Sequence, residues 1–195
     1  KVSDKIGVIR NLMTRVDAII VGGAMAYTFL KARGFAVGKS RVEDDKLELA
    51  RELLAEAAKR NVAFLLPLDH VVASAPEAGA ATDTVRQIPP DKMGLDIGPE
   101  TVAEFITRLA DAKTIVWNGP LGFFELPDFA AGTLKVGEAI ASLHGVTSLL
   151  GGGDTAAAVA GHPWAKNFTH ISTGGGATLE YLEGIELPGV KALEA

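Results

Sequence analysis

The sequence contains no cysteine, no long apolar run and no excess of basic residues. Without cysteine the chain has neither disulfide bonds nor thiolate metal sites, and a reducing cytosol fits this composition. No apolar run approaches the roughly 20 residues that span a bilayer. The formal net charge of −5 argues against a broad surface for nucleic acid. We therefore expect a cytoplasmic protein that acts neither on membranes nor on nucleic acid.

What remains is the composition of a globular protein with a sizeable core. Hydrophobic residues make up 48% of the 195 residues and charged residues 22%, and the mean hydropathy is +0.23. This length suits one domain covering residues 1–195. The chain starts at Lys1 instead of Met and enters a helical pattern at once. This start indicates that residues have been removed or that the sequence is part of a longer one.

Short apolar runs alternate with amphipathic segments along the chain. Runs that are apolar on both faces are typical of the inner strands of a parallel sheet. The expected strands are residues 18–21, 62–66, 114–117, 146–150 and 168–171. The expected helices are residues 4–16, 24–33, 43–60, 99–109, 129–143 and 177–182. This alternation predicts an α/β fold, a Rossmann-like three-layer sandwich with a mainly parallel sheet and helices on both faces.

One stretch does not follow this alternation. Residues 73–92 are rich in Ala, Thr and Pro and have few large apolar residues. We expect an irregular excursion there that holds short strands.

Four of the strands end in glycine-rich or Asn-Gly-Pro turns, which should open onto one edge of the sheet. Ligands bind at the carboxyl ends of the strands in such folds. Glycine lets backbone N–H groups approach an anion, and the start of a following helix adds partial positive charge. Glycine can also serve only a tight turn. Three strand–glycine–helix units favour phosphate binding, and they are residues 22–23, 151–153 and 174–176.

Two familiar phosphate-binding signatures are absent from these turns. No strand leads into G-x-G-x-x-G, which disfavours an ordinary dehydrogenase. Residues 34–40 look like a P-loop, but they have three residues between the glycines instead of four and follow a helix instead of a strand. We interpret this segment as a surface turn.

A few charged side chains can be given either a structural or a functional role from the sequence. Asp154 follows three glycines, so its carboxylate either caps a helix or binds Mg²⁺ on nucleotide phosphates. Lys1 and Lys5 share a helical face, where lysines either remain solvated or contact phosphate. The histidines show no metal-ligand spacing, and no Ser-His-Asp or paired-carboxylate arrangement can be assigned.

Taken together, these segments resemble the C-terminal, nucleotide-binding domain of the phosphoglycerate kinase family. The resemblance spans essentially the whole chain, in the order and spacing of that family. Its motifs are KVSDKI at 1–6, GGAMA at 22–26, MGLDIGP at 93–99, WNGP at 117–120, GGGDT at 151–155, HISTGGGA at 170–177, LEG at 182–184 and LPGV at 187–190.

The resemblance implies roles for individual residues. Gly22, Gly23 and Leu95 would line an adenine pocket, and Glu125 would hydrogen-bond the ribose. Asn118 and Pro120 would lie beside the nucleotide. Asp154 would hold Mg²⁺, with Gly152, Gly153 and Thr155 near the phosphates. Lys1 and Lys5 would reach the phosphate chain and the transferring group, near the backbone amides of Gly174, Gly175 and Gly176.

The implied reaction moves a phosphoryl group between 1,3-bisphosphoglycerate and MgADP, giving 3-phosphoglycerate and MgATP in glycolysis. The family's N-terminal domain, which binds the phosphoglycerate, is absent from this sequence. We therefore expect a monomeric chain that binds MgADP or MgATP and transfers phosphate negligibly alone. A non-catalytic nucleotide-binding module and a structural α/β domain that binds nothing remain the alternatives.

Overall fold

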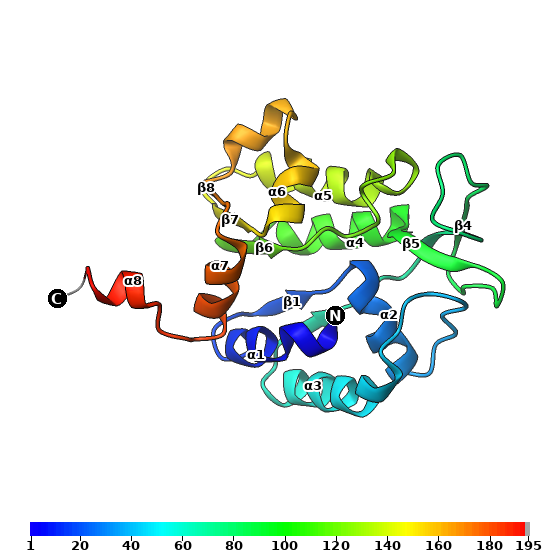
Figure 1. Ribbon diagram of the computed structural model, residues 1–195, viewed down its shortest axis with the longest axis horizontal. Coiled ribbons are helices and arrows are strands. Elements are labelled where there is room, and N and C mark those ends of the chain that lie inside the picture. Colours follow the sequence, from blue (N-terminus) through cyan, green and yellow to red (C-terminus); the bar gives the residue numbers. More distant parts are fainter. Residues whose placement is uncertain (194–195) are drawn as a thin grey trace.

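Strands and helices alternate along residues 1–193, which are the residues that the computed structural model describes (Figure 1). β1 (Ala18–Ile20) and β2 (Ala63–Leu65) form one parallel pair. A second parallel sheet has the order β6 (Thr114–Asn118), β7 (Thr147–Gly151), β8 (His170–Ser172). The predicted α/β class is confirmed, and the five expected strands all form to within two residues of their predicted starts.

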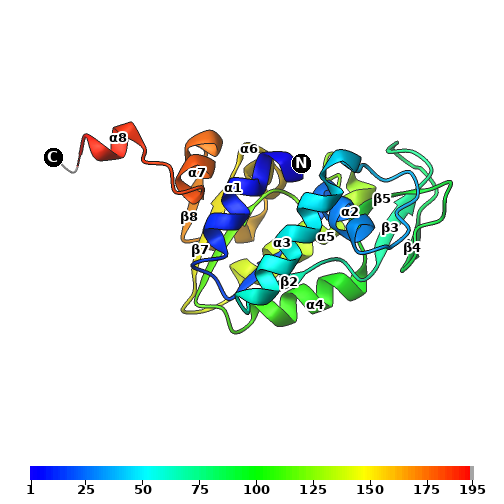
Figure 2. The same ribbon diagram turned by 90° about the horizontal axis from the view of Figure 1, so that it is seen from below.

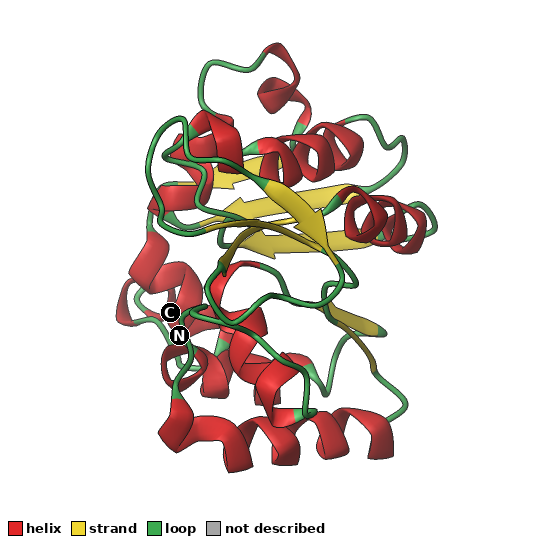
Figure 3. Ribbon diagram, turned by 90° about the vertical axis from the view of Figure 1, so that its right-hand side faces the viewer, coloured by secondary structure: helices red, strands yellow, loops and turns green. Residues whose placement is uncertain are grey.

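Helices cover these strands from two sides, so that the strands lie between two groups of helices in Figure 3. None of the helices within residues 1–193 combines the length and the apolar character that a membrane crossing requires. α8 lies apart from the other helices in both Figure 1 and Figure 2. The α-helices are α1 (Val2–Leu12), α2 (Gly23–Ala32), α3 (Leu47–Lys59), α4 (Pro99–Leu109), α5 (Ala131–Ala141), α6 (Gly153–Val159), α7 (Gly175–Leu182) and α8 (Pro188–Lys191).

One short strand lies wholly within residues 73–92, and two others flank that stretch. β3 (His70–Ala73) pairs antiparallel with β4 (Asp83–Val85) and with β5 (Met93–Ile97). The sequence does not identify β5 as a strand, because Gly94 and Asp96 interrupt its apolar pattern. Gly94 is required by a distant neighbour, since a Cβ atom there would lie 2.1 Å from the Tyr27 hydroxyl oxygen.

Two hydrophobic clusters form the core, and the β1–β2 pair lies between them. The first cluster joins α1, α2 and α3, and Ile19 and Phe64 pack against it. The second joins α4, α5, β6 and β7, and Ile20 and Leu65 pack against it. Because successive residues of a strand point to opposite faces, β1 and β2 each contribute to both clusters.

The β6–β7 sheet is unequally covered on its two faces. Ile115 and Trp117 of β6 are buried in the second cluster. Val116, between them, is 40% exposed, and its register partner Leu149 on β7 is 36% exposed. Burial is therefore confirmed for the face of β6 that carries Ile115 and Trp117, and the expected burial of the opposite face is wrong, because Val116 and Leu149 stay partly exposed there.

The start of α4 shows how buried carboxylates fix helix ends in this fold. Pro99 is the first helical residue, as predicted. Asp69, just before β3, accepts hydrogen bonds from the backbone N–H groups of Glu100 (3.1 Å) and Thr101 (2.8 Å). The Thr101 hydroxyl donates to the same carboxylate at 2.7 Å. These groups satisfy N–H donors that a helix start leaves without partners, so β3 and α4 are held together.

His70 is a buried histidine packed against Tyr27, with ring centroids 5.5 Å apart. Its Nδ1 atom has no hydrogen-bond partner among residues 1–193, and the residue is 4% exposed. Burial lowers the pKa of His70 to about 4, although the nearby Asp69 acts to raise it. The unfolded chain therefore binds a proton near pH 6.5 that the folded chain does not, and stability falls as the pH drops from 6.5 toward 4.

We expect His70→Phe to weaken this acid sensitivity, because phenylalanine keeps the ring and cannot bind a proton. Between pH 8 and pH 5 the wild-type chain should lose about 2 kcal/mol more free energy of unfolding than the variant. Urea denaturation at both pH values measures the difference. His144→Phe is the control, because His144 is exposed in the fold. Equal pH dependence in the wild type and His70→Phe would contradict the prediction.

Candidate functional site

The glycine-rich turns of the second parallel sheet open onto a common edge. Asn118, Gly151 and Ser172 are the last residues of β6, β7 and β8, and they are register partners across the sheet. The turn after β1 joins this edge, because the Gly23 N–H donates to the Leu121 carbonyl at 2.9 Å. The expectation that the four turns share an edge is confirmed.

Each of three turns leads directly into a helix, and glycine is required at specific points. Gly23 begins α2 with φ +64°, and a Cβ atom there would lie 2.9 Å from the Pro120 carbonyl oxygen. Gly152 precedes α6 with φ +97°. Gly175 begins α7, and a Cβ atom on it would lie 3.5 Å from the Gly152 Cα atom. Backbone therefore lies against backbone at this edge, with little side-chain material between the turns.

Lys5 and Asn118 connect α1 to the end of β6. The Lys5 ammonium donates to the Asn118 Oδ1 atom at 2.7 Å. Burial lowers the pKa of Lys5, while the negative charges of Asp4 and Glu183 oppose this effect. A partly desolvated ammonium favours an anionic partner, because burial removes the water that stabilises its charge.

The other half of the Asn118 amide lacks a partner. Asn118 Nδ2 is buried and has no hydrogen bond within the described chain, and Cβ atoms on Gly151 and Gly152 would each lie 3.3 Å from it. The Lys5 contact fixes which amide atom is the oxygen, so the free atom is the donor. A buried donor without an acceptor costs about 1–3 kcal/mol, so an acceptor brought to this position would stabilise the fold.

Residues 119–123, which follow β6, are fixed by hydrogen bonds at five points. The Gly119 N–H donates to Thr155 Oγ1 (2.7 Å), and its carbonyl accepts from Trp117 Nε1 (2.8 Å). The Leu121 N–H donates to Thr133 Oγ1 (2.9 Å), and its carbonyl accepts from Gly23. The Phe123 N–H donates to the Leu95 carbonyl (2.7 Å). The 119–123 segment thus ties α2, β5, α5 and α6 to the end of β6.

Glu43 holds the start of α1, a role that the sequence does not reveal. Its carboxylate accepts from the Val2 N–H (2.5 Å) and from the Ser3 N–H (3.4 Å) and hydroxyl (2.5 Å). Partial burial acts to raise the pKa of Glu43, but these hydrogen bonds outweigh it and lower the pKa. Because the Glu43 carboxylate already accepts from the first N–H groups of α1, these groups are not free to bind another anion.

The structure brings some of the predicted site residues together and leaves others apart. Lys5 with Asn118, and Gly152 and Gly153 with Gly175, lie close together at the edge. Gly22, Gly23 and Pro120 form a second group, which the 119–123 segment links to Leu95. Lys1, Glu125, Asp154 and Gly176 are exposed at or near the edge. Thr155 is buried beneath the turn, where its hydroxyl binds Gly119.

Asp154 is the residue through which the site could hold a cation. Its carboxylate has no hydrogen-bond or ion-pair partner in residues 1–193, and no side-chain hydrogen bond caps α6. The described chain also lacks any group of three His, Cys, Asp or Glu side chains able to hold a metal ion. One free carboxylate suits Mg²⁺ bound largely by phosphate oxygens and water, because Mg²⁺ in nucleotide sites is held by one or two carboxylates.

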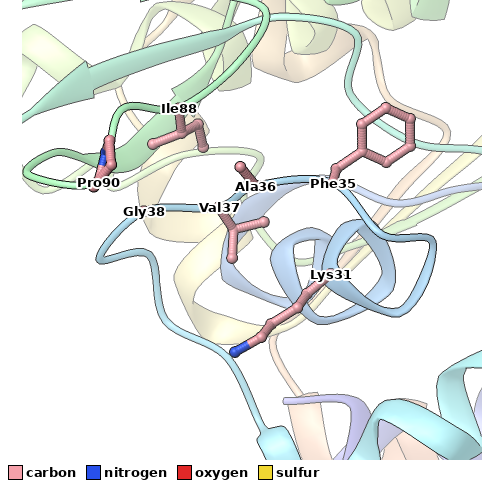
Figure 4. A pocket seen from close by; sticks show the side chains of 7 residues that line it. All are labelled: Lys31, Phe35, Ala36, Val37, Gly38, Ile88 and Pro90. Atoms are coloured by element: carbon pink, nitrogen blue, oxygen red, sulfur yellow. The ribbon is translucent and has the colours of Figure 1, made fainter.

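The P-loop-like segment lies elsewhere, after α2. Gly34 and Gly38 have φ values of +90° and +52°, and the Lys39 N–H donates to the Lys92 carbonyl at 2.8 Å. The segment borders an open cavity of about 340 Å³ (Figure 4). Lys31, on its border, pairs with Asp44. The interpretation as a surface turn is confirmed, because the segment follows a helix and most of its residues are exposed.

Comparison with known proteins gives a consistent result over almost the whole chain. The family model described as phosphoglycerate kinase matches residues 1–185. Phosphoglycerate kinase of Koribacter versatilis is 57% identical over 99% of this chain, and that of Lactobacillus delbrueckii subsp. lactis is 58% identical over 97%. These matches cover 49% and 47% of the relatives. The chain thus spans about half the length of the curated relatives it matches.

Solved structures agree in fold. The phosphoglycerate kinase of Coxiella burnetii superimposes with a TM-score of 0.94 at 41% identity, over 99% of this chain and 50% of that chain. The enzyme of Pyrococcus horikoshii gives a TM-score of 0.83 at 32% identity, over 100% of this chain and 49% of that chain.

Thr155→Val should destabilise the fold by about 1–3 kcal/mol, because valine keeps the shape of threonine but leaves the Gly119 N–H without its acceptor. Urea denaturation measures the loss. Thr107→Val is the matched control, since the Thr107 hydroxyl is exposed and donates only to the Ala103 carbonyl of its own helix. The control should change stability by no more than about 0.5 kcal/mol. A similar loss of unfolding free energy in both variants would contradict the stabilising role of the hydrogen bond between Gly119 and Thr155.

Proposed function

This chain belongs to the phosphoglycerate kinase family, and we propose that it binds an adenine nucleotide with Mg²⁺ at the edge where β1, β6, β7 and β8 end. In that role it supplies the nucleotide half of phosphoryl transfer between 1,3-bisphosphoglycerate and MgADP, which yields 3-phosphoglycerate and MgATP. Residues 1–195 would form this nucleotide-binding domain as a monomer.

The observation that carries the proposal is the Asn118 amide. Lys5 takes its oxygen, and its buried Nδ2 donor has no partner within residues 1–193. The Asn118 Nδ2 atom lies beside Gly151 and Gly152, where a phosphate could approach the backbone closely. A structural domain that binds nothing would gain from an internal acceptor for this donor, and residues 1–193 provide none.

The two groups of site residues support a division of the nucleotide between them. Gly22, Gly23 and Leu95 border the 119–123 segment and would contact the adenine, with Pro120 beside it. Glu125 is exposed just beyond that segment and would accept hydrogen bonds from the ribose. Lys5, Asn118, Gly152, Gly153 and Thr155 would surround the phosphates.

The charged residues would act on the phosphates and the transferring group. Asp154 would hold Mg²⁺, which neutralises phosphate charge when it is bound with the nucleotide. Lys1 and Lys5 would balance the negative charge that remains, with the backbone of Gly174, Gly175 and Gly176 donating to the transferring group. An arriving phosphate would favour the charged form of Lys5, which burial disfavours.

In the reaction, the bond between phosphorus and the acyl oxygen of 1,3-bisphosphoglycerate breaks, and a bond to the terminal phosphate oxygen of ADP forms. This direct in-line transfer needs no nucleophilic side chain, so catalysis consists of positioning and charge stabilisation. The phosphoglycerate would bind on the part of the longer relatives that this chain does not cover. The 195 residues alone would then be a nucleotide-binding module without turnover.

MgADP should raise the thermal unfolding midpoint of the chain, because a ligand that binds the folded state stabilises it. Asp154→Asn should weaken MgADP binding about tenfold and change ADP binding in EDTA by less than twofold, because the carboxylate acts through the metal. Titration calorimetry with and without Mg²⁺ measures both constants.

Asp111→Asn is the control for charge, since Asp111 is exposed near the opposite, amino-terminal end of β6. It should leave both constants unchanged. Equal weakening of MgADP and free ADP by Asp154→Asn would contradict the metal role, and no stabilisation of the wild type by MgADP would favour a structural domain.

The chain alone should show no turnover with 3-phosphoglycerate and MgATP, because half of the groups that bind the transition state are missing. The measurement is ADP release above the enzyme-free rate, with a full-length member of the family as positive control. Turnover that rises in proportion to the concentration of the purified chain would contradict the proposal that this chain supplies only the nucleotide-binding half.

A further inference from the structure

A buried carboxylate outside the predicted site links β5 to the start of α5. Asp96 is 1% exposed. Its Oδ2 atom accepts from the Gly132 N–H at 2.7 Å, and its Oδ1 atom accepts from the Ile97 N–H at 2.8 Å. Gly132 is in the first turn of α5, so the carboxylate satisfies a donor that the helix start leaves free.

The same carboxylate lies directly against the 119–123 segment. A Cβ atom on Gly122 would lie 2.2 Å from Asp96 Oδ1, and one on Gly132 would lie 2.4 Å from the same atom. Two glycines on separate elements thus make room for one carboxylate. Any change in the position of Asp96 therefore acts on both the 119–123 segment and α5.

The hydrogen bonds continue from Asp96 to the adenine side of the edge. Gly132, which Asp96 holds, is followed by Thr133, whose hydroxyl accepts from the Leu121 N–H. The Leu121 carbonyl in turn accepts from the Gly23 N–H at the start of α2. The residue before Asp96, Leu95, accepts from the Phe123 N–H. Asp96 therefore follows Leu95 directly in the chain, and it is connected to Gly23 through Gly132, Thr133 and Leu121.

We propose that Asp96 is a positioning residue for the nucleotide, which sets the distance of the 119–123 segment from β5 and so the shape of the adenine subsite. The proposal rests on the proposed function, because it concerns the same ligand. Asp96 itself does not touch the nucleotide, and it acts through Gly122, Gly132 and Thr133.

The test compares two buried aspartates that have the same chemistry. In Asp96→Asn an amide nitrogen replaces one acceptor, so that either Gly132 or Ile97 loses its hydrogen bond. Asp69→Asn is the matched control, because Asp69 also accepts from a helix start, but its partners Glu100 and Thr101 have no role in binding. Burial raises the pKa of Asp96 to about 7, against the effect of the Gly132 and Ile97 N–H groups and Lys135, so titrations are run at pH 8, where the carboxylate is charged.

Both variants should lower the thermal unfolding midpoint by several degrees, since each leaves a buried donor without a partner. Calorimetry well below these midpoints should show MgADP binding about tenfold weaker in Asp96→Asn and within twofold of the wild type in Asp69→Asn. Equal affinity in both variants would reduce Asp96 to a structural residue and overturn the proposal.

Gly122→Ala provides a second variant that keeps the carboxylate, in case Asp96→Asn does not fold. Its added methyl group displaces the 119–123 segment from Asp96, so MgADP affinity should again fall about tenfold. Wild-type affinity in Gly122→Ala would overturn the proposal.

Hydrogen exchange separates failure of this proposal from failure of the proposed function. Asp96→Asn should speed exchange of the Leu121 and Phe123 amides at least tenfold, whereas Asp69→Asn should not. If the wild type does not bind MgADP, the proposed function fails and this measurement still tests the positioning role. Unchanged exchange at both amides in Asp96→Asn would overturn it.

Discussion

The backbone of Leu121 makes the contact on which the arrangement of the edge depends. Its N–H donates to Thr133 in α5, and its carbonyl accepts from Gly23 at the start of α2. One residue therefore connects the helices of the two hydrophobic clusters across the ends of the strands. The β1–β2 pair connects the clusters through apolar side chains, and Leu121 connects them through hydrogen bonds of its backbone. These two hydrogen bonds link the start of α2 to α5 at the edge that carries the glycine turns.

Buried threonines hold the loops of this fold in a recurrent way. Thr28, Thr101, Thr133 and Thr155 each belong to a helix and are at most 1% exposed. Each hydroxyl accepts from the backbone N–H of a loop or turn, at Glu43, at Leu68 and Asp69, at Leu121 and at Gly119. Because buried N–H groups need acceptors, a threonine on a rigid helix fixes a loop without adding charge to the core. Neutral hydroxyl groups thus hold the loops around the site, in addition to the buried Asp96 carboxylate.

Features encoded over a few neighbouring residues could be predicted from the sequence. The strand–glycine–helix units at residues 22–23, 151–153 and 174–176 are local patterns, and so is Pro99 at the start of α4. β5 could not be predicted, because Gly94 and Asp96 are required by Tyr27 and by α5, which are distant in sequence. The role of Thr133 could not be predicted either, because its pattern is that of any helical threonine and its partner Leu121 is known only from the structure. Glu43 looked like the first residue of a helix, and it serves α1 instead.

The contact between Glu43 and α1 has a consequence for the order in which the chain folds. α1 is 11 residues long, below the roughly 12–15 at which isolated helices become stable in water. The carboxylate that accepts its first N–H group is 41 residues further along the chain. During synthesis, α1 is therefore made well before Glu43. The start of α1 can be fixed only after the segment that follows α2 has been made. The end of α1 that lies near Lys5 therefore reaches its final structure only once Glu43 is available to accept its hydrogen bonds.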